Sequence, residues 1–134
     1  KIMMGRSMEA TADLHDRCEV CLKENAVPED DIFAILLSIE EIYTNFVKYN
    51  PKGGDRIEVQ LDCGTDRVVA SLTDYEANRF DPREAPPVKL EMPLHERKPG
   101  GLGIHIVKQV MSEVEYSYKD RVSKVTLTRL IGKR

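Results

Sequence analysis

The sequence predicts an α/β (α+β) two-layer sandwich, in which helices cover one face of a mostly antiparallel mixed sheet. Three observations predict it. The chain has 134 residues, enough for one domain with a real core. Its apolar residues follow the helical period in three segments and are typical of strands in four others. These segments follow one another as helix, helix, two strands, an irregular stretch, helix and two strands, and no repeat or linker divides them. We therefore expect a single domain over residues 1–134.

The composition is that of an ordinary globular protein: 41% of the residues are hydrophobic, 32% are charged and the net charge is −3. Bulk charge therefore gives no indication of a basic face for nucleic acid. No apolar run approaches the roughly 20 residues of a membrane-spanning helix, and the start of the chain is too short and too weakly apolar for a signal peptide. We expect a soluble, cytoplasmic protein that contacts neither nucleic acid nor membrane directly.

Residues 1–9 are interpreted as the truncated edge of a further strand, or as residues foreign to the domain. The first helix is expected at about residues 10–25, where four apolar residues share one face: Leu14, Cys18, Cys21 and Leu22. The odd number of cysteines, three, argues against a disulfide framework and for a reducing compartment. Cys18 and Cys21 have the spacing of a metal or redox pair. No second Cys/His pair completes a zinc site, so buried apolar positions are the preferred interpretation.

The second helix is expected to open near Pro28, with three acidic residues in its first turn, and to run to about Lys48 or Tyr49. Residues 50–54, Asn-Pro-Lys-Gly-Gly, then end it. Its buried side is expected to draw on five apolar residues, namely Phe33, Leu36, Leu37, Phe46 and Val47.

Two strands follow, at residues 57–62 and 68–73, with a turn at residues 63–66 and Asp74 at the end of the second strand. Residues 75–100 are interpreted as irregular and hold five of the seven prolines. A stretch of this length inside a compact domain is usually a functional lid or binding loop, and a tolerated surface insertion is the alternative.

The third helix is expected to open at residues 100–103, with an apolar face made of Ile104, Val107, Val110 or Met111, and Val114. Two final strands are expected at residues 114–119 and 123–130, joined by a turn at Asp120 and Arg121.

A polar motif lies on the second helix, where Glu41, Asn45 and either Lys48 or Tyr49 share one face. A carboxylate, an amide oxygen and an amine there can serve a hard cation and a phosphate chain, because Mg²⁺ prefers oxygen ligands and keeps several waters. The carboxylate one turn away can accept a proton from a hydroxyl nucleophile. For this motif alone, a solvated polar face is the preferred interpretation.

Two further motifs follow along the chain. Asp74, at the end of its strand, can accept a hydrogen bond from an adenine amino group or cap a turn. Residues 100–103, Gly-Gly-Leu-Gly, enter a helix, where glycine backbone and unpaired N–H groups favour phosphate. The alternative is a glycine-rich tight turn. The segment is neither the dinucleotide fingerprint nor a P-loop.

Together and in this order, these motifs resemble those of the anti-sigma factor serine kinases (RsbW-like proteins) of the histidine-kinase-like ATPase (GHKL) superfamily. The matching segments are residues 38–49, 74–82 and 100–116, and the resemblance extends from about Asp13 to Leu130. It implies the Bergerat ATP-binding fold, with an ATP lid at residues 75–100. It also implies a homodimeric kinase that phosphorylates a serine or threonine of a STAS-domain anti-sigma factor antagonist and sequesters a sigma factor.

The resemblance also implies roles for individual residues. Asn45 matches the Mg²⁺ ligand, Glu41 the general base and Asp74 the adenine-binding aspartate. Gly101 and Gly103 match the glycines that hold the phosphates. The implied ATP-binding set is completed by Lys48, Leu102, Ile104 and Thr126, with Thr128 as the alternative to Thr126. ATP and Mg²⁺ are the implied cofactors.

One departure from the pattern concerns the adenine side. The kinases that the chain resembles usually have a glycine two residues after the aspartate, where this chain has Glu76, and Phe80-Asp81-Pro82 follows one residue later. A side chain there can crowd the loop beneath the base, which bears on nucleotide affinity more than on the fold.

Two rival functions follow from the same residues. One is a binding module that sequesters a partner with little or no kinase activity. The other is the ATP-binding domain of a larger signalling protein. A histidine-kinase role is disfavoured, because no motif is shared by the three histidines, His15, His95 and His105.

Overall fold

A computed structural model describes residues 2–49, 56–75 and 101–131 of the chain. The elements follow in the order β1 (Ile2–Met4), the 3₁₀ turn η1 (Met8–Ala10), α1 (Thr11–Glu24), α2 (Glu29–Tyr49), β2 (Ile57–Cys63), β3 (Arg67–Asp74), α3 (Gly101–Val110), β4 (Glu113–Lys119) and β5 (Val122–Leu130). The expected element order and the N-terminal strand are therefore confirmed. The expected lid, residues 75–100, lies outside the described residues except for Tyr75.

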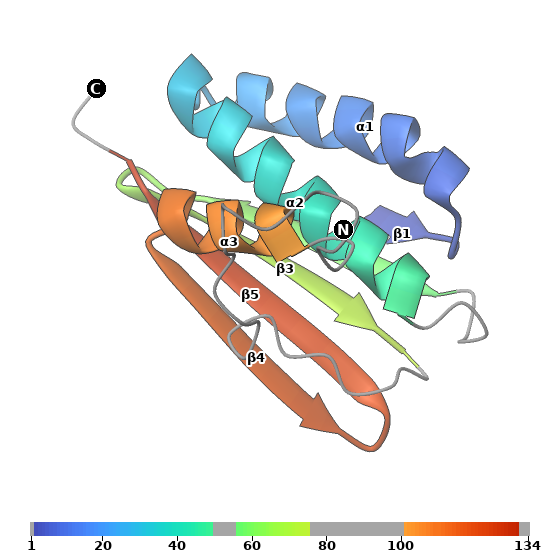
Figure 1. Cartoon of the computed structure of the whole chain (residues 1–134). Helices are drawn as coiled ribbons and strands as arrows, with labels where there is room; N and C mark the ends of the chain where they lie inside the picture. The colour runs from blue at the N-terminus through green and yellow to red at the C-terminus, as the bar shows by residue number, and fades with distance from the viewer. Residues whose placement is uncertain (1, 50–55, 76–100, 132–134) are drawn as a thin grey trace.

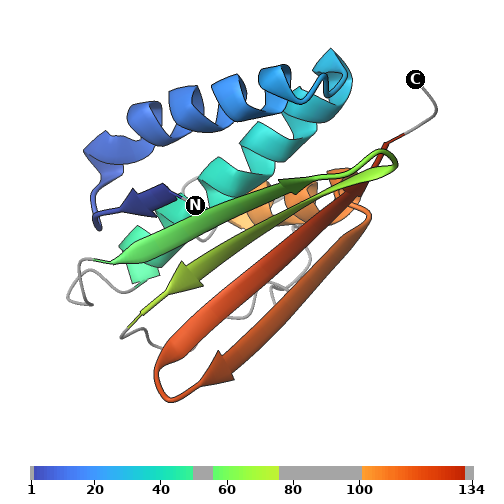
Figure 2. The same ribbon diagram turned by 180° about the vertical axis from the view of Figure 1, so that it is seen from behind.

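The strands form one sheet in the order β1-β2-β3-β5-β4. The three helices of the described part of the chain lie on one face of this sheet, and the opposite face is open in the view from behind (Figures 1 and 2). The two-layer α+β fold is thus confirmed. All pairings between the described strands are antiparallel, so the sheet is antiparallel where a mixed one was expected.

Tight turns set the register of the two hairpins. Between β2 and β3, the Gly64 N–H donates to the carbonyl of Arg67 at 2.8 Å. Between β4 and β5, Asp120 and Arg121 both have positive φ, 52° and 63°. Two successive residues with positive φ are the signature of the type I′ turn, whose twist matches that of the flanking strands. The turn predicted at these two residues is therefore confirmed.

Helix α2 supplies the largest share of the packed core cluster, through seven buried apolar residues: Ile32, Ile35, Leu36, Ile39, Ile42, Tyr43 and Phe46. Their spacing of three or four residues is that of one helix face. The prediction that Phe33 is buried was wrong, because it stands one position, about 100°, away from Ile32 on the helix. Its side chain is 72% exposed. Val114 also differs from expectation, since α3 ends at Val110 and Val114 belongs to β4.

Helix α1 packs on α2 through Leu14, Cys18 and Leu22, all buried. Burial raises the pKa of the Cys18 thiol to about 12, and the neighbouring Cys21 acts in the same direction. Cys21 and Cys63 are partly exposed, and none of the three cysteines forms a disulfide. Cys18 therefore packs as a small apolar side chain, as the preferred interpretation expects, whereas Cys21 is less buried than that interpretation expects.

An ion pair joins the beginning of α2 to the end of the chain's last strand. The Arg129 Nε donates to Asp31 Oδ1 at 2.9 Å, and Arg129 Nη1 donates to the carbonyl of Val110. The carboxylate lies in the first turn of α2, and the guanidinium caps the last turn of α3, as the helix dipoles favour. Arg129 thus connects α2, α3 and β5. Among the described residues, none of the helices has both the length and the apolar character needed to cross a membrane.

Two phenylalanines on the same helix test this description of the core. Phe46 is 2% exposed and Phe33 is 72% exposed. We expect Phe46→Ala to lower the free energy of unfolding by about 3–5 kcal/mol, and the matched change Phe33→Ala to alter it by less than about 0.5 kcal/mol. Urea denaturation measures both. Similar losses in the two variants would contradict the orientation of α2.

The three thiols test the burial of α1. Iodoacetamide at about pH 8 is expected to alkylate Cys21 and Cys63 at least about 100-fold faster than Cys18, because the thiolate is the reacting form and Cys18 is both buried and held protonated. Mass spectrometry of digested samples gives the three rates. In concentrated urea the three rates should converge. Equal rates in the native protein would show that Cys18 is accessible.

Candidate functional site

The C-terminal half of α2 carries a buried amide beside a carboxylate. Asn45 is fully buried, and its Nδ2 donates to the Glu41 carbonyl oxygen at 2.6 Å and to Glu41 Oε1 at 2.9 Å. Both partners are acceptors only, so the amide nitrogen must face Glu41 and the amide oxygen must point elsewhere. The structure therefore brings Glu41 and Asn45 together, as their spacing of one helical turn predicts.

The amide oxygen of Asn45 is left without a partner. Asn45 Oδ1 is the one buried side-chain nitrogen or oxygen atom in the described part of the chain that has no hydrogen-bond partner. A buried acceptor in this state is unfavourable by about 1–3 kcal/mol, and native structures contain few of them. An amide oxygen held open in this way fits a hard cation such as Mg²⁺, which takes oxygen ligands and completes its shell with water and phosphate. Lys48, in the last turn of α2, is exposed on the same side of the helix.

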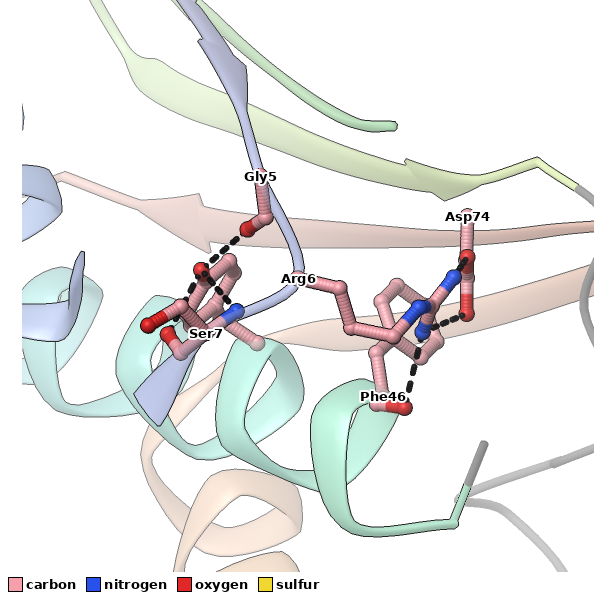
Figure 3. A network of polar contacts seen from close by, with 6 residues as sticks. Gly5, Arg6, Ser7, Phe46 and Asp74 are labelled. Carbon is pink, nitrogen blue, oxygen red and sulfur yellow. Dashed lines mark hydrogen bonds and ion pairs between the residues drawn. The ribbon is translucent and has the colours of Figure 1, made fainter. Parts of the chain in front are cut away.

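Asp74, at the end of β3, is buried and already paired within the chain. Its Oδ1 forms an ion pair with Arg6 Nη2, and its Oδ2 accepts from Arg6 Nη1 at 3.1 Å. Arg6 Nη1 also donates to the carbonyl of Phe46 at 3.0 Å. The side chains of Arg6 and Asp74 are 3% and 1% exposed. Figure 3 shows the guanidinium lying between the end of α2 and the carboxylate.

The surroundings of Asp74 act on its protonation in opposite directions. Burial raises the pKa of the carboxyl group, and the hydrogen bonds and charge of Arg6 lower it. The burial effect is the larger, so the pKa lies above the ordinary value of an aspartate. Asp74 is therefore a carboxylate that depends on a cation or a donor at its side.

Tyr43 holds the segment that carries Arg6. Its hydroxyl donates to the carbonyls of Gly5 at 2.6 Å and Ser7 at 2.9 Å, alternatives for a single hydrogen, and lies 3.4 Å from the Ser7 N–H. Tyr43 is fully buried on α2, three residues before Phe46. The strand β1 and the residues after it are thus tied to the helix that carries Asn45 (Figure 3).

The glycine segment opens α3 as expected, since the helix begins at Gly101. Its first turn lies beside the C-terminal half of α2, against which α3 packs (Figure 1). The backbone N–H groups of a first turn have no partners within the helix, which favours an anion there. The side chain of Ile104 is buried in the core, so a role for it at a phosphate would use its backbone N–H.

The sheet register places Ser123, not Thr126, opposite Asp74. Asp74 pairs with Ser123, whereas Thr126 pairs with Ser71. Directly paired residues project to the same face and successive residues alternate, so Ser123 shares the helix-covered face with Asp74 and Thr126 points to the other face. Thr128 lies on that other face too. Ser123 is fully buried, and its Oγ lies 3.3 Å from Tyr116 Oη.

Sequence reasoning missed three residues of this site. The sequence could have indicated Ser123, because it lies at the same alternate positions of β5 as the buried residues Val125 and Leu127. Arg6 and Tyr43 had none, because their contacts join residues 36 to 68 positions apart. Glu76 and the segment 80–82 lie outside the described residues.

A second group of possible metal ligands lies on α1. Suitable atoms of His15, Asp16 and Glu19 lie within 4.8 Å of one another. Asp16 is exposed, and His15 Nδ1 already contacts Glu40 Oε1 at 3.0 Å. Nothing in this group corresponds to the buried, unpaired oxygen of Asn45.

Comparison with known proteins gave one family. The model of the histidine kinase-like ATPase domain matches residues 7–129 of the 134. The matched range contains Glu41, Asn45, Asp74 and the start of α3. A search of curated proteins found no match.

Proposed function

This chain belongs to the family of histidine kinase-like ATPase domains, and from that premise we propose that it binds Mg-ATP and acts as a protein-serine/threonine kinase and anti-sigma factor. In this proposal it works by partner switching: it phosphorylates a STAS-domain antagonist and sequesters a sigma factor, as a homodimer.

The observation that carries the proposal is the unpaired, buried Oδ1 of Asn45. ATP binding is the property expected of an ATPase domain, and the amide oxygen is a ready ligand for the accompanying Mg²⁺. Bound magnesium would neutralise phosphate charge. Glu41 keeps this oxygen available, because it accepts both hydrogen bonds of the amide nitrogen. The amide cannot turn its nitrogen toward the metal without breaking them.

Glu41 is proposed to act on the incoming hydroxyl. It is partly exposed, one turn before Asn45, and its Oε1 is 2.9 Å from Asn45 Nδ2. In the proposed reaction the hydroxyl oxygen of the protein substrate forms a bond to the γ-phosphorus, the bond from phosphorus to the bridging oxygen breaks, and ADP leaves. Glu41 accepts the hydroxyl proton. The residues contribute mainly positioning and charge, as in other phosphoryl transfers.

The first turn of α3 is proposed to hold the phosphates. Gly101 and Gly103 lie in this turn, beside α2, and add no side chain between the helix backbone and an anion. Lys48 supplies a cation on the same side of α2. The two helices together offer N–H donors, an amine and an amide oxygen to one phosphate chain.

A second candidate function is a binding module that sequesters its partner with little use of nucleotide. One observation favours it: both oxygens of Asp74 are engaged by Arg6. An adenine amino group would have to share or displace this pair. Glu76, in place of the glycine found in the kinases that the chain resembles, points in the same direction.

Metal-dependent nucleotide binding tests the first proposal. We expect calorimetry to show that Mg²⁺ tightens ADP binding to the wild-type protein, and that Asn45→Ala weakens Mg-ADP binding by about tenfold or more, since one charge-assisted contact is lost. Thr44→Ala is the matched control, because Thr44 Oγ1 donates to the same Glu41 carbonyl at 3.2 Å and Thr44 stands one position, about 100°, away from Asn45 on the helix. If neither variant loses affinity for Mg-ADP, Asn45 is not a ligand of the metal.

Phosphate transfer separates the kinase from the binding module. Glu41→Gln is expected to leave Mg-ATP affinity within a few-fold and to lower transfer of labelled phosphate to a STAS-domain protein by about 10²–10⁴, the usual contribution of a positioned base. The control is Glu40→Gln, a neighbouring carboxylate that contacts His15 instead.

Two outcomes count against this account. Equal transfer rates in the Glu41→Gln variant and the wild type would disprove the assignment of the base. If the wild-type protein transfers phosphate to no such partner and still holds a sigma factor, the binding module replaces the kinase.

A further inference from the structure

The Arg6 side chain already bonds the carboxylate of Asp74, on which recognition of a nucleotide base would depend. Its two terminal nitrogens bond both oxygens of Asp74 and the carbonyl of Phe46. A two-point contact of this kind is among the strongest polar contacts in proteins. Because both side chains are almost completely buried, solvent does not weaken it. The end of β3 is therefore closed by a residue of the same chain.

An adenine amino group and the Arg6 guanidinium compete for the same atoms. Both are hydrogen-bond donors, and both need the lone pairs of the Asp74 carboxylate. The guanidinium also fills space next to that carboxylate (Figure 3). Each Asp74 oxygen accepts one hydrogen bond from Arg6 and keeps a further lone pair, but the carboxylate is only 1% exposed beside the guanidinium. A base that bonds Asp74 directly must therefore share the carboxylate with the guanidinium or move it away.

We propose that Arg6 is a specificity-determining residue that competes with the base of a bound nucleotide for Asp74. This inference rests on the nucleotide site proposed above. It predicts that the wild-type protein discriminates weakly between adenine and guanine. Adenine presents an amino donor where guanine presents a carbonyl acceptor. An Asp74 carboxylate that is already bonded to Arg6 stabilises the binding of neither base.

Displacement of Arg6 would also disturb the N-terminal strand β1. Arg6 follows β1, which pairs with β2 through Ile2, Met3 and Met4. The Tyr43 hydroxyl donates to the carbonyl of Gly5 or of Ser7, on either side of Arg6. Withdrawal of the guanidinium from Asp74 pulls on both attachments. Nucleotide binding should then loosen this short edge strand.

The experiment compares nucleotide affinities by calorimetry on the full chain. Mg-ADP and Mg-GDP are titrated into the wild type, Arg6→Gln, Asp74→Asn and the double variant. Arg6→Gln is expected to bind Mg-ADP about tenfold or more tightly than the wild type, because the competing charge-assisted contact is gone. Its affinity for Mg-GDP should change by no more than a few-fold. In the Asp74→Asn background, the change at Arg6 should have little effect, which shows that the two residues act as a pair.

Two controls accompany this comparison. Arg67→Gln removes an exposed arginine at the beginning of β3 that pairs with Asp66, and it should leave both affinities unchanged. Arg6→Lys keeps the charge with a single-point contact, and it should give an intermediate affinity for Mg-ADP. Thermal unfolding confirms that each variant is folded.

A second measurement applies if removal of Arg6 leaves Asp74 unpaired and the variant does not fold. Hydrogen exchange of the wild type is then followed with and without saturating Mg-ADP. Faster exchange at Met3 and Met4 with nucleotide supports displacement of Arg6. Unchanged or slower exchange there overturns it.

The outcomes separate this inference from the proposed function. If the wild type binds Mg-ADP and Arg6→Gln binds it equally or less tightly, Arg6 has a purely structural role and only this inference fails. If the wild type binds poorly and Arg6→Gln binds well, the inference is supported in its strongest form. If neither binds any nucleotide at millimolar concentration, the proposed function fails and this inference with it.

Discussion

The packing of α2 is the contact on which the rest of the structure depends. This helix contacts α1, α3, β3 and β5, and its core face runs from Ile32 to Phe46. Asn45 immediately precedes the buried Phe46, so core packing fixes the position of the amide as well. A helix anchored in this way holds a functional side chain more firmly than a loop does. The same burial explains why Asn45 Oδ1, the one buried side-chain nitrogen or oxygen without a hydrogen-bond partner among residues 2–49, 56–75 and 101–131, is found on α2.

The polar contacts around Arg6 join three elements that the core alone would leave apart. The guanidinium links the end of β1 to Asp74 on β3 and to the carbonyl of Phe46 on α2. A buried ion pair adds little net stability compared with apolar packing, but removal of one partner is strongly unfavourable. The pair of Arg6 and Asp74 therefore fixes how β1, β3 and α2 are joined more than it adds to the stability of the fold.

Local patterns predicted most of the fold and part of the site. The bounds of α1 and α2, the turn at Asp120 and the spacing of Glu41 and Asn45 depend on residues close in sequence, and the structure agrees with these predictions. The prediction that Phe33 is buried was wrong because apolar character alone does not distinguish the core face of a helix from its flank. Thr126 was chosen without knowledge of the strand register, which depends on the pairing of β5 with the neighbouring strand β3. The pair between Arg6 and Asp74 spans 68 residues, and no local pattern predicts it.

The central claim is that Asn45 holds a metal ion together with a nucleotide, and paramagnetic broadening by Mn²⁺ tests it most directly. Nuclear magnetic resonance spectra of side-chain amides would be recorded with substoichiometric Mn²⁺, with and without ADP. Our account predicts that the Asn45 amide signal disappears only when ADP is present. The signal of Asn25, which precedes the other end of α2 and bonds the Cys21 carbonyl at 2.8 Å, should persist. An Asn45 signal that survives, or broadening centred on His15 regardless of ADP, would contradict the account.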